Sequence, residues 1–287
     1  KSYSCPSCGA ELICDESTAA TACPYCGNPS IVPGQFSGSL KPDFVLPFKL
    51  SKDDAVKALK AHYKGKPFLP RQFTNKNHVQ EIKGVYVPFW MFDGKATGSA
   101  QYEATRSRCY TSGDYEVTET DHFDVFREGS IAFEKVPVDA SSKMPDDYMD
   151  SIEPFDYKEL KHFSTAYLPG FLADKYDVSV EDCHERADTR CEGSLVAALG
   201  DTVTGYDSCV PVSHDVKLRR GKVHYALLPI WLLSTNWHGK NYLFAMNGQT
   251  GKLVGDLPTS AGKFWGTFAA ISAVLTALIS AGYLLFA

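Results

Sequence analysis

The segment from Phe264 to Ala287 contains no charged residue, and no other feature of the chain limits the fold as strongly. At ~1.5 Å per residue, about 20 helical residues cross a hydrocarbon core of roughly 30 Å, so the run is long enough to span a bilayer. Trp265 and Tyr283 lie near its ends, where aromatic side chains of membrane helices meet the headgroups. A buried helix of a soluble core is the alternative. We predict a transmembrane helix over 264–287, because buried helices seldom run this far without a charge.

Two CPxCG strings lie close together near the start of the chain, CPSCG at 5–9 and CPYCG at 23–27. Two cysteines three residues apart reach one metal ion when the backbone between them turns tightly, and the glycine after the second cysteine permits the positive φ of such a turn. Paired CxxC strings are typical of metal sites rather than of a disulfide framework. We therefore predict one metal site with the ligands Cys5, Cys8, Cys23 and Cys26, in a small all-β ribbon over residues 1–40.

Four thiolate ligands fix the role of this metal. They form a closed tetrahedral shell at ~2.3 Å, which leaves no open position for activating water. The expected ion is structural Zn²⁺, whose binding free energy folds a segment too small for a core of its own. Iron in a rubredoxin-like site uses the same ligands and is the alternative.

The ribbon has little charge suited to nucleic acid. Residues 1–40 carry Lys1 against Glu11, Asp15 and Glu16, and the whole chain has a formal net charge of −5. Binding to phosphates requires Lys or Arg at the contact surface. We expect no nucleic-acid partner, although a nucleic-acid-associated ribbon protein, accessory to replication or a helicase, is the alternative function.

The other five cysteines are widely and irregularly spaced, which favours a reducing compartment where thiols stay unpaired. Lys263 precedes the apolar run, but Asp256 lies nearby and weakens this positive-inside signal. Together these features predict a single-pass protein of the cell membrane with the bulk of the chain in the cytosol. The start of the chain, Lys-Ser-Tyr, is expected to be a trimmed end with residues upstream.

Residues 41–258 read as a strand-rich α+β body. Ser51 and Asp54 form a capping-box-like helix start, and a second helix is expected to be capped near Ser179. The order of a Leu-Pro strand, a helix, a Pro-x-Trp strand and hairpins occurs twice, from residues 45–48 and from residues 167–171. We predict a body built from two similar units; coincidence among short apolar-proline strings is the alternative. A hairpin is expected over 102–126 with its turn at 112–114, and a second hairpin turn at 237–240. Tight turns are expected at Asn247-Gly248 and Thr250-Gly251.

The sequence contains none of the catalytic motifs that we sought. Residues 248–252, GQTGK, lack the spacing of a phosphate-binding loop, and neither GxSxG nor HExxH occurs. Cys183, His184 and Cys191 lie close enough in the sequence for a second metal site, but an amphipathic helix with buried thiols is favoured. The basic cluster Lys217, Arg219, Arg220 and Lys222 is expected to solvate a hairpin rather than to meet acidic lipid or a partner. We predict a protein that is not an enzyme.

Several strings resemble a bacterial family of membrane-anchored zinc-ribbon proteins. They are the two CPxCG strings, DFVLPFKLSKDDAVKALKAHYKGK, GVYVPFWMFD, SIEPFDYKELKHFSTAYLPGFLADKYDV, and YALLPIWLL with FAMNGQTGKLVGDLP, and they cover nearly the whole chain. Members are often labelled as replication-restart or helicase-like proteins, a label at odds with the missing nucleotide-binding loop. Better-understood relatives act as membrane anchors in phage-shock-type envelope-stress systems, beside flotillin-like (SPFH-type) and phage-shock-A-like proteins. The resemblance implies anchoring and recruitment of partners, a second ribbon upstream, and no catalytic residues.

Overall fold

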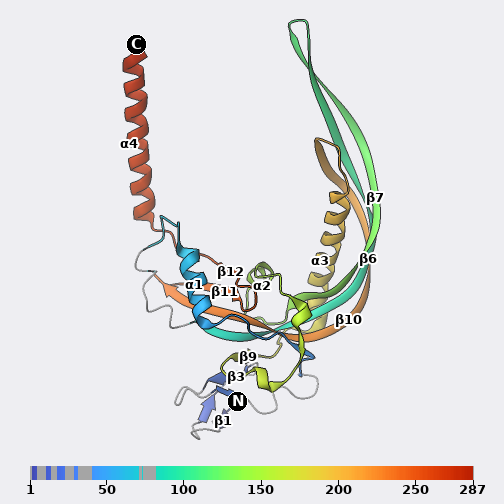
Figure 1. Cartoon of the computed structure of the whole chain (residues 1–287), viewed down its shortest axis with the longest axis vertical. Helices are drawn as coiled ribbons and strands as arrows, with labels where there is room; N and C mark the ends of the chain where they lie inside the picture. Colours follow the sequence, from blue (N-terminus) through green and yellow to red (C-terminus); the bar gives the residue numbers. More distant parts are fainter. Residues whose placement is uncertain are drawn as a thin grey trace.

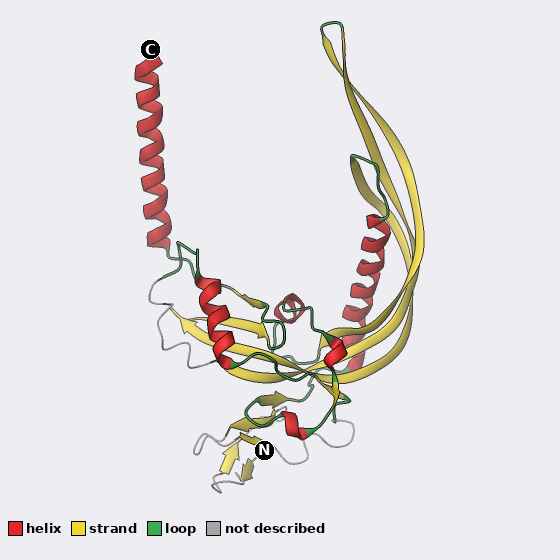
Figure 2. Cartoon of the chain, viewed as in Figure 1, coloured by secondary structure: helices red, strands yellow, loops and turns green. Residues whose placement is uncertain are grey.

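The computed structural model describes residues 2–4, 11–13, 18–22, 29–31, 41–70, 73 and 82–286 (Figures 1 and 2). The strands are β1 Ser2–Ser4, β2 Glu11–Ile13, β3 Thr18–Ala22, β4 Pro29–Ile31, β5 Phe44–Val45, β6 Lys83–Ser112, β7 Tyr115–Asp139, β8 Lys161–His162, β9 Leu172–Asp174, β10 Ser208–Trp237, β11 Lys240–Asn247 and β12 Leu253–Gly255. The α-helices are α1 Lys52–Tyr63, α2 Asp146–Ser151, α3 Val180–Asp201 and α4 Ala261–Phe286, and single 3₁₀ turns occupy Tyr157–Glu159 and Thr165–Tyr167.

One large mixed sheet organises the described chain. Its order is β12-β11-β10-β6-β9-β3-β4; β7 also pairs with β6, and β5 joins β10 and carries β8. The short strands β1 and β2 form a separate antiparallel pair. The predicted α+β class is therefore confirmed. Strands β3 and β4, which lie inside the predicted ribbon, extend the large sheet through the pairing of β3 with β9.

The predicted succession of strand, helix and long strands occurs twice, but the second unit does not begin with a strand at 167–171: Thr165–Tyr167 form a 3₁₀ turn, and the first strand of that unit is β9, Leu172–Asp174. β5, α1, β6 and β7 are followed by β9, α3, β10 and β11. The long strands β6 and β10 run antiparallel, and Val87 pairs with Leu228. Each unit gives its first strand to the other unit. β5 lies parallel to β10 at Ala226 and Leu227, whereas β9 lies parallel to β6 at the equivalent residues Val85 and Tyr86.

The same hydrogen bonds occur at equivalent positions of the two units. Trp90 Nε1 on β6 donates to Val178 O at 3.0 Å, and Trp231 Nε1 on β10 donates to Leu50 O at 3.1 Å. Each acceptor carbonyl directly precedes the N-cap serine of a helix that belongs to the other unit. The two indoles therefore tie each helix start to the long strand of the opposite unit.

Backbone bonds repeat this correspondence. Ala140 N donates to Pro88 O at 2.9 Å, and Gly248 N donates to Pro229 O at 2.8 Å. The carbonyl of Ala140 in turn accepts from Val178 N, as that of Gly248 accepts from Leu50 N. The two units thus share a backbone network as well as an order of elements.

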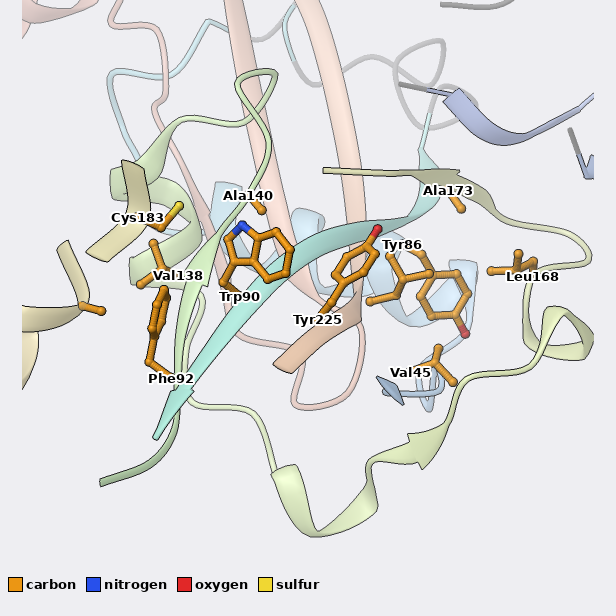
Figure 3. Packing of buried hydrophobic residues seen from close by; sticks show 12 residues of the cluster. Val45, Tyr86, Trp90, Phe92, Val138, Ala140, Leu168, Ala173, Cys183 and Tyr225 are labelled. Carbon is orange, nitrogen blue, oxygen red and sulfur yellow. The ribbon is translucent and has the colours of Figure 1, made fainter. Parts of the chain in front are cut away.

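Both faces of the central strands are buried. Along β6, Tyr86, Trp90 and Phe92 point into the cluster that α3 and β9 cover, as Figure 3 shows together with Tyr225 of β10. The alternate side chains Val85, Val87, Phe89 and Met91 pack on the opposite face against Met149, Ile152 and Phe155. This two-sided burial explains why residues 85–92 form a continuous apolar run rather than an alternating one.

The units differ at one end of the sheet, where β6, β7 and β10 extend into a curved arm (Figure 1). α3 has 22 residues against the 12 of α1, and its additional turns pack Leu195 and Leu199 against Ala100, Tyr102 and Ala104 on the arm. β10 begins at Ser208, opposite Thr105 of β6. Farther out on the arm, β6 and β7 pair only with each other, up to a turn at Gly113 and Asp114.

The predicted helix starts and turns are confirmed, and the predicted strand lengths are wrong. Ser51 and Asp54 form the capping box of α1, Ser179 caps α3, and the hairpin turns fall at 113–114 and 238–239. The first hairpin was expected over 102–126, but its strands together reach from Lys83 to Asp139. Most distal side chains are exposed on both faces, so no apolar alternation marks the continuing strands.

The equivalence of Trp90 and Trp231 generates a stability test. Replacing either with phenylalanine leaves a part-buried carbonyl without its donor, which costs about 1 kcal/mol of unfolding free energy. W90F and W231F are expected to lower the urea midpoint by similar amounts in mild detergent. W265F is the matched control, because Trp265 is 63% exposed and is expected to change the free energy by less than ~0.5 kcal/mol. If either W90F or W231F left the urea midpoint unchanged, the two hydrogen bonds would not be equivalent.

Candidate functional site

The predicted metal ligands Cys5, Cys8, Cys23 and Cys26 lie outside the described residues, as does Cys14. The strands that flank them are described. β1 pairs antiparallel with β2 through Ser4 and Glu11, and β3 pairs antiparallel with β4 through Ala22 and Pro29. Each CxxC string therefore falls, in sequence, between the two strands of an antiparallel pair, which is the position a zinc ribbon requires of its ligands.

Among the described residues, no group of three His, Cys, Asp or Glu side chains is arranged to hold a metal ion. Cys183 and Cys191 face the core from α3, and burial raises the pKa of the Cys183 thiol to about 11. His184 packs beside Phe92, with ring centroids 5.2 Å apart. The interpretation of this segment as an amphipathic helix with buried thiols is confirmed.

The GQTGK string is part of a turn between β11 and β12. Asn247 Oδ1 accepts from the backbone N–H groups of Gln249 and Thr250, both at 2.9 Å. The Gln249 side chain is itself engaged, because its Oε1 accepts from Asp156 N at 2.7 Å. The donors that a phosphate-binding loop would offer are used inside the protein here.

A charged cluster joins α3 to α2 and β7. Arg186 Nη1 donates to Asp139 Oδ1 at 2.9 Å and Arg186 Nη2 to Asp150 Oδ1 at 3.1 Å, while Arg190 Nη2 donates to Glu153 Oε2 at 2.8 Å. The Asp139 side chain is only 1% exposed. Burial raises the pKa of Asp139 to about 6, against the opposing effect of the Arg186 guanidinium.

Sequence reasoning missed this cluster. Its only signal was the placement of two arginines one helical turn apart, at positions 186 and 190. Asp139 occupies the position in the first unit that Asn247 occupies in the second, and both are buried. The cluster holds α3 against the sheet through ion pairs and hydrogen bonds, so its geometry is that of a clamp.

A cleft of about 740 Å³ lies between the start of α1, the start of β6 and β9. Phe48 and Phe171 stack in its wall, with ring centroids 4.1 Å apart. Thr21 of β3 also lines it, so the ribbon strands border the cleft.

The base of α4 is fixed to the body at the loop that follows α1. Ser260 N donates to Phe68 O at 2.8 Å, and Lys263 Nζ donates to Leu69 O at 2.7 Å. The Phe68 and Phe264 rings meet at 5.6 Å. α4 contains a 20-residue apolar segment, Ala261–Ser280, none of which is buried, and this length and composition suffice to cross a membrane.

The predicted basic cluster at 217–222 lies on β10. Arg220 forms an ion pair with Asp188 of α3 at 2.6 Å. Arg219 pairs in register with Lys95 of β6. Asp188 of α3 thus neutralises one of the four charges of the basic cluster.

These elements define an α+β protein with a large mixed sheet and a C-terminal helix that is apolar enough to span a membrane. The chain belongs to the family of YdjG of Bacillus subtilis (strain 168), with which it is 40% identical over an alignment of 320 positions that covers 94% of each chain. That relative is described as an uncharacterized protein. No family model and no solved structure matches the chain. The resemblance to membrane-anchored zinc-ribbon proteins therefore stays a prediction.

The predicted metal site is tested by metal analysis. The purified chain is expected to contain one zinc per molecule, and a variant with Cys5→Ser and Cys8→Ser is expected to lose it, because two thiolates cannot complete the shell. C109S/C209S is the matched control: both thiols are exposed and lie outside the predicted ligand set. Elemental analysis that finds iron, or an unchanged zinc content in the first variant, would refute the prediction.

The clamp predicts a pH-dependent loss of stability. R186Q removes the partner of a buried carboxylate, which costs about 3 kcal/mol while Asp139 is ionised. Because burial raises the folded-state pKa of Asp139 above its ordinary value, the loss is expected to be largest above pH 6 and to shrink toward pH 4. Urea unfolding at pH 5 and pH 7.5 measures it, and D139N/R186Q should recover stability at pH 7.5. An R186Q effect that does not depend on pH would contradict this assignment.

Proposed function

We propose that the chain is a non-enzymatic, membrane-anchored zinc-ribbon scaffold that recruits or stabilises a protein complex at the cytosolic face of the cell membrane. The observation that carries the proposal is α4. Its large apolar side chains, among them Ile271, Leu278 and Ile279, are more than half exposed, and an apolar helix surface of this kind is stable in water only when something covers it. A bilayer covers it along its whole length.

The zinc ribbon and the body supply the scaffold surfaces in this proposal. The arm is the most extended of them, and Tyr110 and Tyr115 are exposed near its tip. Tyrosine is enriched in protein interfaces because it brings large contact area and a polar group together. By resemblance, the partners are flotillin-like or phage-shock-A-like proteins, and the process is an envelope-stress response.

The arm limits how α4 can enter a bilayer. In Figure 1 the arm and α4 rise from the same body, and the tip of the arm reaches about the level of the C-terminal end of α4. β7 carries Glu116, Glu119, Asp121 and Asp124 near this tip, and these charges exclude it from the hydrocarbon. Insertion of α4 therefore requires an orientation of α4 relative to the arm that differs from the one in Figure 1.

The alternative, a nucleic-acid-associated protein, has less support. The basic cluster at 217–222 is its best feature, and Arg220 is already paired with Asp188. The exposed end of the arm is acidic, which repels phosphates. A DNA or RNA affinity that falls steeply with salt would favour this alternative over the scaffold.

The membrane anchor is tested by fractionation of cells that produce the chain. The full chain is expected in the membrane fraction, to resist extraction by alkaline carbonate, and to be released by detergent, because α4 buries its apolar surface in lipid. A variant that ends at Ser260 lacks this surface and is expected in the soluble fraction. A full chain that is soluble without detergent would overturn the proposal.

A further inference from the structure

We propose that Lys60, Lys64 and Lys66, here called the lysine patch, bind the headgroups of anionic phospholipids beside the point where α4 enters the membrane. This inference rests on the proposed membrane anchor and names the surface of the body that faces the lipid.

The lysine patch is held at the base of α4 by four contacts. His62 Nε2, in the last turn of α1, lies 3.1 Å from Gly255 O at the end of β12. The loop after α1 is tied to α4 through the bond from Ser260 to Phe68, the bond from Lys263 to Leu69 and the contact of the Phe68 and Phe264 rings. Lys64 and Lys66 therefore lie within four residues of Phe68, which contacts the base of α4.

The three ammonium groups are available for a ligand. Lys60, Lys64 and Lys66 are all exposed, and no ion pair within the described residues involves them. By contrast, Lys57 on the same helix pairs with Asp54 at 3.1 Å. No acidic residue occurs between Ala55 and Phe73 in the sequence. The patch is thus a local excess of positive charge in a chain whose net charge is negative.

The dipole of α1 accounts for only one of the three lysines. Lys60 lies in the last turn of α1, where a cation interacts favourably with the helix dipole. Lys64 is the C-cap and Lys66 lies beyond it, where this effect has fallen off. Lysines beside a membrane helix are attracted to anionic headgroups on the cytosolic leaflet, and several of them act together. The lysine patch also supplies positive charge near the span, where the adjoining sequence offers only Lys263 with Asp256 nearby.

The test uses the full chain reconstituted into nanodiscs of phosphatidylcholine that contain one fifth phosphatidylglycerol. Native mass spectrometry then counts the lipids that stay bound when the disc is removed. The wild-type chain is expected to retain phosphatidylglycerol in excess of its share. K60Q/K64Q/K66Q is expected to reduce this preference about tenfold, since each lysine near a membrane surface contributes to binding of anionic lipid.

The control variant is K95Q/K217Q/K222Q, which removes the same charge from exposed lysines of β6 and β10. It should keep the preference. Equal losses in both variants would assign the preference to net charge and overturn the proposal, as would an unchanged preference in K60Q/K64Q/K66Q. Soluble glycerol phosphate added in excess should not compete; competition would assign the patch to free phosphate esters and overturn the lipid assignment.

Flotation with vesicles of phosphatidylcholine alone separates this proposal from the anchor on which it rests. Wild type and K60Q/K64Q/K66Q should both float, because α4 inserts without anionic lipid. A chain that floats but shows no lipid preference overturns the lysine patch alone. A chain that does not float overturns the anchor, and the lysine patch with it.

Discussion

The antiparallel pairing of β6 with β10 is the constraint on which the rest of the described structure depends. It sets Val87 opposite Leu228 and thereby places two equivalent units around one sheet. Because each unit gives its first strand to the long strand of the other, neither unit has a complete sheet of its own. The helices follow from the same pairing, since the indoles of Trp90 and Trp231 hold the helix starts of the opposite units.

The departures from this repeat lie mainly in the arm. α3 begins as α1 does, with a serine N-cap and an aspartate three residues later, and then continues well beyond the length of α1. The β6–β7 hairpin and the first half of β10 extend alongside it. The shared elements form the packed centre, and the elements present in only one unit form the surface that projects from it. The exposed arm of the scaffold that we propose is therefore an elaboration of one half.

Local signals in the sequence predicted the helix starts, because a capping box depends on residues three apart, and the turns, because Asn-Gly and Thr-Gly dictate local backbone geometry. They did not predict the strand lengths, since the distal arm has no buried face to impose a period on residues 105–122. The exchange of β5 and β9 left no sequence signal, because pairing between strands more than eighty residues apart depends on the whole sheet.

The candidate sites divide in the same way. The four cysteine ligands remain a prediction from spacing, supported by the paired strands on either side of each string. The clamp around Asp139 and the lysine patch could be recognised only from the structure. Asp139 is far from Arg186 in the sequence, and Lys66 is almost two hundred residues from α4, near which it lies. Charge near a candidate membrane span is usually sought in the adjoining sequence, whereas α1 and the loop after it bring these lysines close to the base of α4.

The exchanged first strands have a consequence for how the protein is made. When β6 and β7 leave the ribosome, the strand that will lie beside Val85 and the carbonyl that will accept from Trp90 have not yet been synthesised. The first unit therefore cannot complete its folding, and leaves apolar surface exposed, until the chain has been synthesised past β10. Long-range pairing of this kind slows folding and prolongs exposure to aggregation. Nascent chains of this protein are therefore expected to depend on chaperones until the second half has emerged.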